Sequence, residues 1–169
     1  MILRYYNEKD IETLAELFYN TVHTVNAADY TEEELNAWAT GRVDTAKWNA
    51  EFTARRAVVA TENGVTVGFA DMDESGYLDR LYVHKDYQGR GIGRALVEKL
   101  EKEAIKNGVK RFETHASITA EGFFNARSVD VPVFEGITSV QNFSMIPVPL
   151  FMRPGEETVT TYNQNTNLG

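Results

Sequence analysis

The sequence predicts a single globular domain of the α/β class. The chain has 169 residues, of which 43% are hydrophobic and 11% aromatic, which suits one core and is too small for two catalytic domains. Segments with the pattern of strands are interspersed with segments whose apolar residues recur at helical spacing. The pair Asn63-Gly64 between two apolar runs is the strongest short-range signal of a β-hairpin.

The composition excludes several classes of protein. The 25 acidic and 17 basic residues give a formal charge of -8, which disfavours a nucleic-acid surface because phosphate binding needs clustered Lys and Arg. The chain has no cysteine, so disulfides, thiolate metal sites and a cysteine acyl-enzyme are excluded. Its three histidines lack spaced acidic partners, so no metal site is expected. Without a leader pattern or a stretch of about 18 apolar residues, we expect a soluble cytoplasmic protein with no membrane partner.

The N-terminal third is predicted to hold a strand followed by two helices. Residues 2–6 favour a strand, and apolar residues then recur at helical spacing over residues 10–18. Thr31 stands three residues before Glu34 and ahead of apolar residues, which is the capping box that opens a helix. We therefore expect a second, short helix after Thr31.

A hairpin and a further strand are predicted next. The turn at Asn63-Gly64 joins apolar runs at residues 56–61 and 65–70, which should be antiparallel neighbours. A turn around residues 73–76 then leads into a strand at residues 76–84. This strand ends just before a glycine-rich segment.

The glycine-rich segment 88–93 joins that strand to an amphipathic helix. The helix has an apolar stripe between Ile92 and Ile105, and Asn107-Gly108 supplies its stop. A helix N-terminus presents unpaired backbone N–H groups and the positive end of its dipole, and glycines leave room for an anion. The junction is therefore predicted to bind phosphate.

The C-terminal part is predicted to complete the sheet. The expected elements are a strand at residues 111–115, a short helix at 119–126, and a closing pair of strands at 129–134 and 139–145. Prolines and a polar run break the periodicity afterwards. We expect one domain over residues 1–146 and an extended or disordered tail over 147–169.

Two of three known phosphate-binding patterns fit the loop poorly. A Walker A loop ends in Gly-Lys-Ser/Thr, whereas this chain has Gly93-Arg94-Ala95. A dinucleotide fingerprint begun at Gly91 has Leu96 at its third glycine position and a hairpin before it instead of a βαβ unit, so it matches weakly. The remaining pattern is Gln-x-x-Gly-x-Gly, which Gln88 begins.

The ordered run from Tyr77 to Leu96 resembles the strand, loop and helix that hold acetyl-coenzyme A in the GNAT acetyltransferase superfamily. The resemblance covers residues 1–146 and is strongest over 77–127. It implies an α/β fold with a mixed, mostly antiparallel sheet, flanked by helices and split near the cofactor. Segments 28–39 and 115–120 look like a branch of small bacterial acetyltransferases.

The resemblance also implies a cofactor site. Main-chain groups of Leu81, Tyr82 and Val83 would pair with pantetheine as a neighbouring strand does, and one amide would polarise the acetyl carbonyl. Amides of the loop would receive the pyrophosphate, with Arg90 and Arg94 adding positive charge. The expected cofactor-binding residues are Leu81, Tyr82, Val83, Gln88, Gly89, Arg90, Gly91, Ile92, Gly93, Arg94, Ser117 and Phe124.

The sequence departs from the family pattern after His115. Ser117 stands where many relatives have Asn, and Phe124 stands where a tyrosine often protonates the leaving thiolate. Ser128-Val129 replaces the usual Gly-Phe. Either the acceptor site is reshaped or the enzyme works without that acid, which a good thiolate leaving group permits.

Asp79 is the first candidate for the general base, because alternation places it with Tyr77 and Leu81 on one strand face near the expected opening of the sheet. The competing interpretation is that Asp79 forms a structural ion pair with Arg80, Arg111 or another cation. His115, on the neighbouring predicted strand, is the second candidate, although a lone histidine is more often a core residue.

The acceptor is expected over the first two helices, where Tyr30 and Trp38 would bind it, unless both aromatic rings belong to the core. The sequence thus predicts an acetyl-coenzyme A-dependent N-acetyltransferase that acetylates an amine of a small molecule or peptide by direct attack in a ternary complex. The alternative is a catalytically silent acyl-coenzyme A sensor or interaction domain. A homodimer stays open, because small domains of this kind commonly dimerise.

Overall fold

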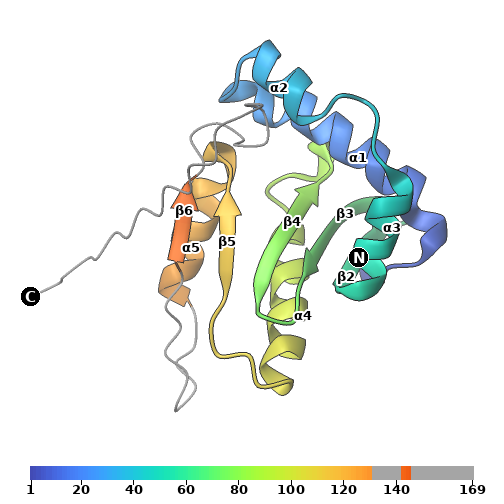
Figure 1. Ribbon diagram of the computed structural model, residues 1–169. Coiled ribbons are helices and arrows are strands. Elements are labelled where there is room, and N and C mark those ends of the chain that lie inside the picture. The colour runs from blue at the N-terminus through green and yellow to red at the C-terminus, as the bar shows by residue number, and fades with distance from the viewer. Residues whose placement is uncertain (131–141, 146–169) are drawn as a thin grey trace, which may run out of the picture.

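The computed structural model describes residues 1–130 and 142–145, which form a mixed β-sheet covered by helices (Figure 1). The sheet has six strands that lie side by side in chain order. The strands are β1 (Ile2–Tyr5), β2 (Arg56–Glu62), β3 (Val65–Met72), β4 (Tyr77–Val83), β5 (Glu113–Ala116) and β6 (Asn142–Met145). Strands β1 to β4 are antiparallel neighbours, whereas β5 is parallel to β4 and β6 is parallel to β5. The predicted mixed, mostly antiparallel α/β fold is confirmed.

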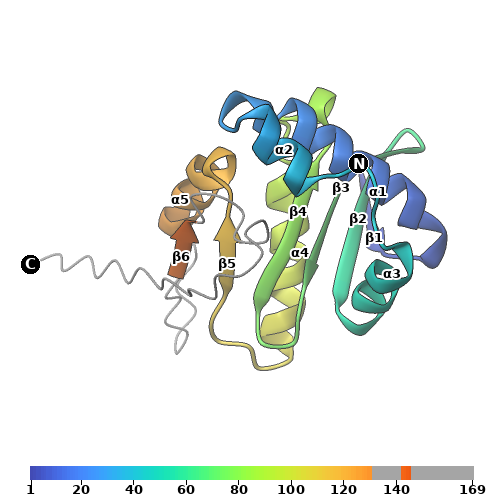
Figure 2. The same ribbon diagram turned by 45° about the horizontal axis from the view of Figure 1, so that its top comes forward.

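Helices cover both faces of the sheet (Figures 1 and 2). The main helices are α1 (Ile11–Thr24), α2 (Glu32–Trp38), α3 (Thr45–Ala54), α4 (Ile92–Lys106) and α5 (Glu121–Asp130). Short 3-10 turns lie at η1 (Glu8–Asp10), η2 (Asn26–Ala28), η3 (Lys85–Tyr87) and η4 (Ile118–Ala120). The hydrophobic residues of α4 pack on one face of the sheet, and those of α1, α2 and α3 pack on the other.

Strand β2 shows why the central strands are apolar on both faces. Val58 and Ala60 pack in the cluster formed with α4, while Ala57 and Val59 pack in the cluster formed with α1 and α3. All four side chains are buried. A strand with helices on both sides must be apolar at successive positions, not only at alternate ones.

Three local sequence motifs form the caps and the turn that they predict. The Thr31 side chain accepts the Glu34 N–H, and the Glu34 carboxylate accepts the Thr31 N–H at 2.8 Å, so the capping box opens α2. The hairpin turn has Asn63 at φ 51° and Gly64 at φ 80°, the positive values that a tight turn of this type needs. Helix α4 likewise ends at Asn107.

Helix α3 is an element that the sequence did not predict. Of its ten residues only Phe52 is buried, so its apolar stripe is too weak to stand out from the loops around it. The Asp44 side chain caps it by accepting the Lys47 N–H at 2.9 Å. The helix is held to the sheet mainly through tertiary contacts that are not visible in a local pattern.

The predictions after β5 need correction. Helix α5 continues to Asp130, so residues 129–130 are helical and do not begin the predicted strand 129–134. A proline disfavours the helical conformation for the residue before it, so Pro132 permits a helix to extend as far as Asp130. Strand β6 confirms residues 142–145 of the last predicted strand and pairs with β5. The predicted segments 131–134 and 139–141 and the tail 147–169 lie outside the described residues.

Strands β4 and β5 pair over a short distance and then separate. Their described pairing consists of Tyr77 with Glu113 and Leu78 with Thr114, while β4 continues to Val83. Within residues 1–130 and 142–145, the edge of β4 that faces β5 is therefore free of strand pairing beyond Leu78. This is the split in the sheet that the family resemblance implied.

A β-bulge lies at the same point of β4. Asp71 of β3 faces Arg80 and Met72 faces Leu78, which leaves Asp79 as the additional residue. Leu78 and Leu81 consequently both pack in the α4 cluster although they are three residues apart. The expected alternation of Tyr77, Asp79 and Leu81 on one face is therefore wrong, because the bulge shifts the side-chain register.

Strand β3 and helix α4 approach each other closely at Gly68. A Cβ atom at Gly68 would lie 3.0 Å from the Tyr82 carbonyl oxygen and 3.2 Å from side-chain atoms of Ile92 and Leu96. We expect Gly68→Ala to lower the free energy of unfolding by about 1–3 kcal/mol, because the helix and strand must move apart. Urea denaturation measures this loss. Gly122→Ala, where the new Cβ would meet no described atom within 4 Å, is the matched control; equal stabilities of the two variants would contradict the prediction.

Candidate active site

A pocket of about 420 Å³ lies at the split between β4 and β5. Its walls come from α1, η2, β4, the glycine-rich loop, the start of α4, β5, η4 and α5. The lining residues are Thr21, Val25, Asn26, Trp38, Asp79, Leu81, Tyr82, Val83, Tyr87, Gln88, Gly89, Gly91, Ile92, Gly93, Arg94, Thr114, His115, Ala116, Ser117, Thr119, Ala120, Phe123, Phe124 and Ala126. Most of the predicted cofactor-binding and catalytic residues are thus brought together in one place.

The glycine-rich loop is open toward solvent where an anion would bind. Gly89 and Gly91 have φ values of 70° and 78°, which L side chains rarely adopt, and a Cβ on either would meet no described atom within 4 Å. Gly91 is the N-cap of α4 and offers no side chain to the first N–H groups of this 15-residue helix. The helix dipole and these N–H groups therefore face an open cradle that suits a pyrophosphate.

Gln88 shapes this loop through its side chain. Its Nε2 donates to the Val83 carbonyl oxygen at 2.6 Å, and the Thr21 hydroxyl donates to the same oxygen at 3.3 Å. These two hydrogen bonds fix the end of β4 against the loop and against α1. The phosphate cradle and the open strand edge are consequently held in one rigid arrangement.

The two arginines of the loop differ in position. Arg94 lines the pocket, with its Nε 3.3 Å from the Glu98 carboxylate one helical turn away. Arg90 lies outside the lining, where it pairs with Glu62 at 2.6 Å and stacks over the Tyr87 ring at 4.8 Å. Of the two, Arg94 is the cation that a ligand in the pocket would meet.

Asp79 lines the pocket at the bulge and forms ion pairs there. The Arg55 guanidinium at the end of α3 hydrogen-bonds its Oδ2, and Arg80 approaches the same oxygen at 3.4 Å. Arg111, the other cation considered for it, instead pairs with Glu113 at 2.5 Å. The Asp79 side chain is 29% exposed, so it is both paired and open to the pocket.

Behind Asp79 lies a second carboxylate that is fully buried. Asp71 has 0% exposure, its Oδ2 accepts hydrogen bonds from Arg55 and Arg80 at 3.2 Å each, and its Oδ1 has no hydrogen-bond partner among the described residues. Burial raises the pKa of Asp71 from its ordinary value of 3.8 to about 6, although Arg80 and Arg55 act in the opposite direction. Sequence reasoning did not identify this group.

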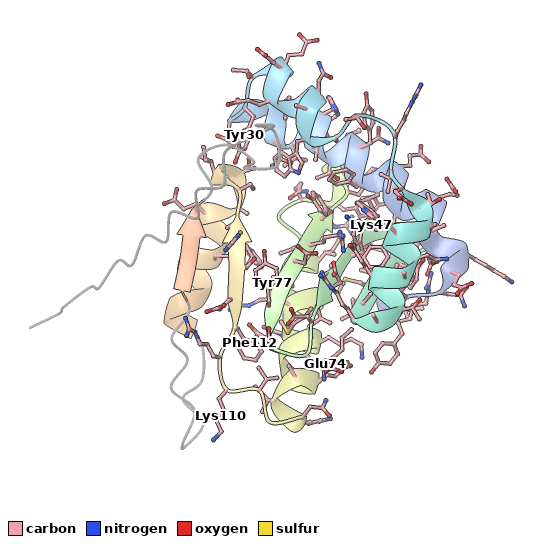
Figure 3. All side chains as sticks on the ribbon, viewed as in Figure 1. Tyr30, Lys47, Glu74, Tyr77, Lys110 and Phe112 are labelled. Carbon is pink, nitrogen blue, oxygen red and sulfur yellow. The ribbon has the colours of Figure 1, made fainter. Side chains whose placement is uncertain are left out.

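His115 also lines the pocket, from β5. Its imidazole is exposed and meets the Tyr77 ring edge-on at 5.5 Å between ring centroids. Figure 3 shows Tyr77 at the level where β4 and β5 separate. His115 is therefore a pocket residue. The competing interpretation, that this lone histidine belongs to the core, is wrong because the side chain is exposed.

The two aromatic residues predicted for the acceptor have different places. Trp38 lines the pocket and is hydrogen-bonded to the Tyr82 hydroxyl, while burial raises the pKa of Tyr82. Tyr30 is 9% exposed and lies outside the lining, against the Trp38 ring at 5.4 Å. Its hydroxyl accepts the Ile118 N–H at 2.8 Å, so it joins the α1–α2 connection to η4 (Figure 3).

Several polar pocket residues were missed by sequence reasoning, namely Thr21, Asn26, Thr114 and Thr119. Asn26 of η2 is 91 and 93 residues away from its hydrogen-bond partners Ser117 and Thr119. No local sequence motif predicts a contact between residues so far apart in the chain. Phe124 is buried in the α4 cluster, which confirms only that an apolar ring occupies this part of the wall.

These features together define a fold and site for acyl transfer from a coenzyme A thioester: an anion cradle at a helix N-terminus beside an unpaired strand edge. The chain belongs to the GNAT acetyltransferase family, because residues 26–127 match the model of the acetyltransferase (GNAT) domain. It is therefore an acetyltransferase, and acetyl-coenzyme A is the cofactor that fits the cradle and the open edge of β4.

Similar proteins come from bacteria. The chain is 31% identical over 122 residues to the uncharacterized N-acetyltransferase YafP of Escherichia coli (strain K12), covering 72% of this chain and 76% of that protein. It is 30% identical over 117 residues to the L-amino acid N-acyltransferase MnaT of the same strain, covering 62% and 63%. A solved GCN5-related N-acetyltransferase from Rhodopseudomonas palustris superposes with a TM-score of 0.71 at 38% identity, covering 75% of this chain and 79% of that one.

Residues 1–130 and 142–145 contain neither a membrane-spanning helix nor a cluster of metal ligands. None of the helices in these ranges is long and apolar enough to cross a membrane. The same ranges hold no group of three or more His, Cys, Asp or Glu side chains that could bind a metal ion.

A negative charge introduced at Gly91 tests whether the glycine-rich loop binds the pyrophosphate. We expect Gly91→Glu to weaken acetyl-coenzyme A binding at least about tenfold, because the carboxylate would repel the pyrophosphate and the residue would resist φ 78°. Isothermal titration calorimetry measures the affinity. Gly108→Glu has the same change at φ +85°, also with no described atom within 4 Å, but lies at the far end of α4. Equal losses in both variants would mean that backbone strain alone is responsible.

The buried Asp71 predicts a pH dependence of stability. Its pKa is higher in the folded than in the unfolded chain, so its stabilising contribution is complete below about pH 4 and is lost as the pH rises through about 6. The shift corresponds to about 3 kcal/mol. Urea denaturation across this window should show a smaller decline for Asp71→Asn than for the wild type. The exposed substitution Asp29→Asn should leave the decline unchanged; an unchanged decline in Asp71→Asn would refute the assignment.

Proposed function

We propose that this protein transfers the acetyl group of acetyl-coenzyme A to an amine of a small molecule by direct attack in a ternary complex. The observation that carries the proposal is that Asp79 lies at the bulge of β4, in the same pocket as Leu81, Tyr82 and Val83. The chain has no cysteine to form an acyl-enzyme. Direct attack is therefore the simpler chemistry.

The cofactor side of the reaction uses main-chain groups. When bound, acetyl-coenzyme A supplies an activated acyl group whose carbonyl carbon accepts an amine. The N–H groups of the loop and of the start of α4 would hold the pyrophosphate, with Arg94 adding charge. The unpaired edge of β4 at Leu81 to Val83 would align pantetheine and offer an amide to the carbonyl oxygen as it gains negative charge.

Asp79 is the proposed general base. An attacking amine must be neutral, so a group in the pocket has to take a proton from the ammonium. Asp79 faces the pocket, and Arg55 and Arg80 hold its carboxylate in a fixed orientation. The ion pair and the catalytic role are compatible, because a paired carboxylate that is 29% exposed still offers an oxygen to solvent and ligand.

His115 remains the second candidate base. Its imidazole lines the same pocket, and the edge-on contact with Tyr77 limits its orientation. It can relay a proton to solvent because it is exposed. A His115→Gln variant with full activity would leave Asp79 as the remaining candidate.

The acceptor is proposed to be a small amine with an apolar part. Trp38 and Val25 give the pocket an apolar wall, and Asp79 provides a carboxylate that favours a cationic group. MnaT, the relative named for L-amino acid N-acylation, supports small amino compounds as the first acceptors to test.

The alternative function is that of a silent acyl-coenzyme A sensor. One observation favours it: the buried phenyl ring of Phe124 stands where a phenol acid is common in the family.

Calorimetry followed by turnover separates these functions. We expect acetyl-coenzyme A to bind with micromolar affinity, with coenzyme A and NAD as comparators. A panel of L-amino acids, polyamines and short peptides then reports thiol release. A sensor would bind the cofactor and release no thiol with any amine, and absence of cofactor binding would overturn both functions.

The role of Asp79 is tested by an isosteric change. We expect Asp79→Asn to keep the affinity for acetyl-coenzyme A within about twofold and to lower kcat by about 100-fold or more, in the range that removal of a general base costs. Steady-state kinetics at saturating cofactor measure kcat. Asp44→Asn, which alters a helix cap remote from the pocket, is the control. Full activity of Asp79→Asn would show that the base is another group.

A further inference from the structure

Asn26 connects the two sides of the split through a pair of hydroxyl groups. Its Nδ2 lies 3.1 Å from Thr119 Oγ1 and 3.5 Å from Ser117 Oγ. All three side chains line the pocket, and Asn26 is only 5% exposed. Burying an amide in the pocket wall is costly unless its polar atoms are hydrogen-bonded, and the two hydroxyl oxygens supply such partners.

The hydrogen bonds restrict the direction of the two hydroxyl hydrogens. A side-chain amide has two N–H donors, and here its nitrogen lies within hydrogen-bond distance of both hydroxyl oxygens. Ser117 Oγ also accepts the Ala120 N–H at 3.3 Å, which caps η4. Neither hydroxyl donates to an acceptor among residues 1–130 and 142–145. Since each hydroxyl oxygen accepts a hydrogen bond from an N–H group, its own hydrogen remains available to a ligand in the pocket.

Among the described residues, the Thr119 hydroxyl makes fewer hydrogen bonds than the Ser117 hydroxyl. Ser117 already has the structural task of capping η4, whereas the recorded hydrogen bond of Thr119 is the one from Asn26. Thr119 and Phe124 line the same part of the chain's pocket wall, on η4 and the first turns of α5. The hydroxyl that this chain lacks at Phe124 is therefore available a few residues earlier.

We propose that Asn26 is a positioning residue that directs the Thr119 hydroxyl into the pocket, where it donates a hydrogen bond to the sulfur of coenzyme A. This inference rests on the proposed function. As the amine forms its bond to the carbonyl carbon, the carbon–sulfur bond breaks and the electron pair stays on sulfur. Thr119 keeps its proton and stabilises this thiolate by hydrogen bonding, while the proton of the amine passes to Asp79 and later to solvent.

The test measures the sulfur directly. Because the protein has no cysteine, coenzyme A supplies the only thiol of the complex, and subtracting the titration of the protein without coenzyme A removes the absorbance of its tyrosines. We expect the thiol pKa in the wild-type complex to lie below that of free coenzyme A. Thr119→Val should raise the bound thiol pKa by about one, the size expected for loss of a hydrogen bond to a charged group, and should lower kcat about tenfold.

A second variant tests the role of Asn26. Asn26→Asp has the same shape but can only accept hydrogen bonds, so the hydroxyl hydrogens would turn toward the new carboxylate and away from sulfur. The bound thiol pKa should rise at least as much as in Thr119→Val. In the Thr119→Val background the same Asn26→Asp change should cause a smaller rise, because only the coulombic effect of the new charge on the thiolate remains there. Thr53→Val removes an exposed helix hydroxyl that donates to the Asn49 carbonyl at 2.7 Å, and it is the matched control with no change.

The outcomes distinguish this inference from the proposed function. If the wild type acetylates amines but Thr119→Val leaves the bound thiol pKa unchanged, the inference is wrong and the function stands. If the wild type lowers the thiol pKa through Thr119 but acetylates no amine, the inference stands and the function is wrong. An unchanged thiol pKa in Asn26→Asp would show that Asn26 does not direct the Thr119 hydroxyl, and no binding of coenzyme A would overturn both proposals.

Discussion

The incomplete pairing of β4 with β5 is the constraint on which the rest of the structure depends. Two paired positions, Tyr77 with Glu113 and Leu78 with Thr114, hold the strands together at one end, and beyond them the edge of β4 is open. An unpaired strand edge inside a domain leaves backbone groups without partners, which is costly unless a ligand or water supplies them. The glycine-rich loop and the pocket both lie at this open edge, where a ligand can pair with its backbone groups.

The bulge at Asp79 and the charges behind it keep this geometry in place. The additional residue turns Asp79 out of the regular alternation, and Arg55 and Arg80 connect it to the buried Asp71. Arg80 also pairs with Glu51 and stacks on Trp48 at 4.8 Å, so α3 is attached to the sheet at the bulge. A buried cluster of this kind is weak evidence for stability, but it fixes the position of each group that belongs to it.

Contacts across the split complete the site from the opposite side. Tyr30 and Asn26, which lie between α1 and α2, hydrogen-bond to Ile118, Ser117 and Thr119. The N-terminal helices thereby reach the β5 side of the pocket without passing through the sheet. This bridge gives Tyr30 a structural contact with η4 although it lies outside the pocket lining, and it holds Asn26 in the wall of the pocket.

The sequence by itself determined the elements whose signals are local: the hairpin at Asn63-Gly64, the capping box at Thr31 and the glycine-rich start of α4. It also predicted the pocket residues that follow one another along the run from Asp79 to Arg94, except Tyr87. Only the tertiary structure decided the bulge, the buried Asp71, helix α3 and the Asn26 bridge. These features depend on contacts between residues far apart in the chain, such as Asp71 with Arg55 or Asn26 with Thr119, whose energies leave no periodic pattern in the sequence.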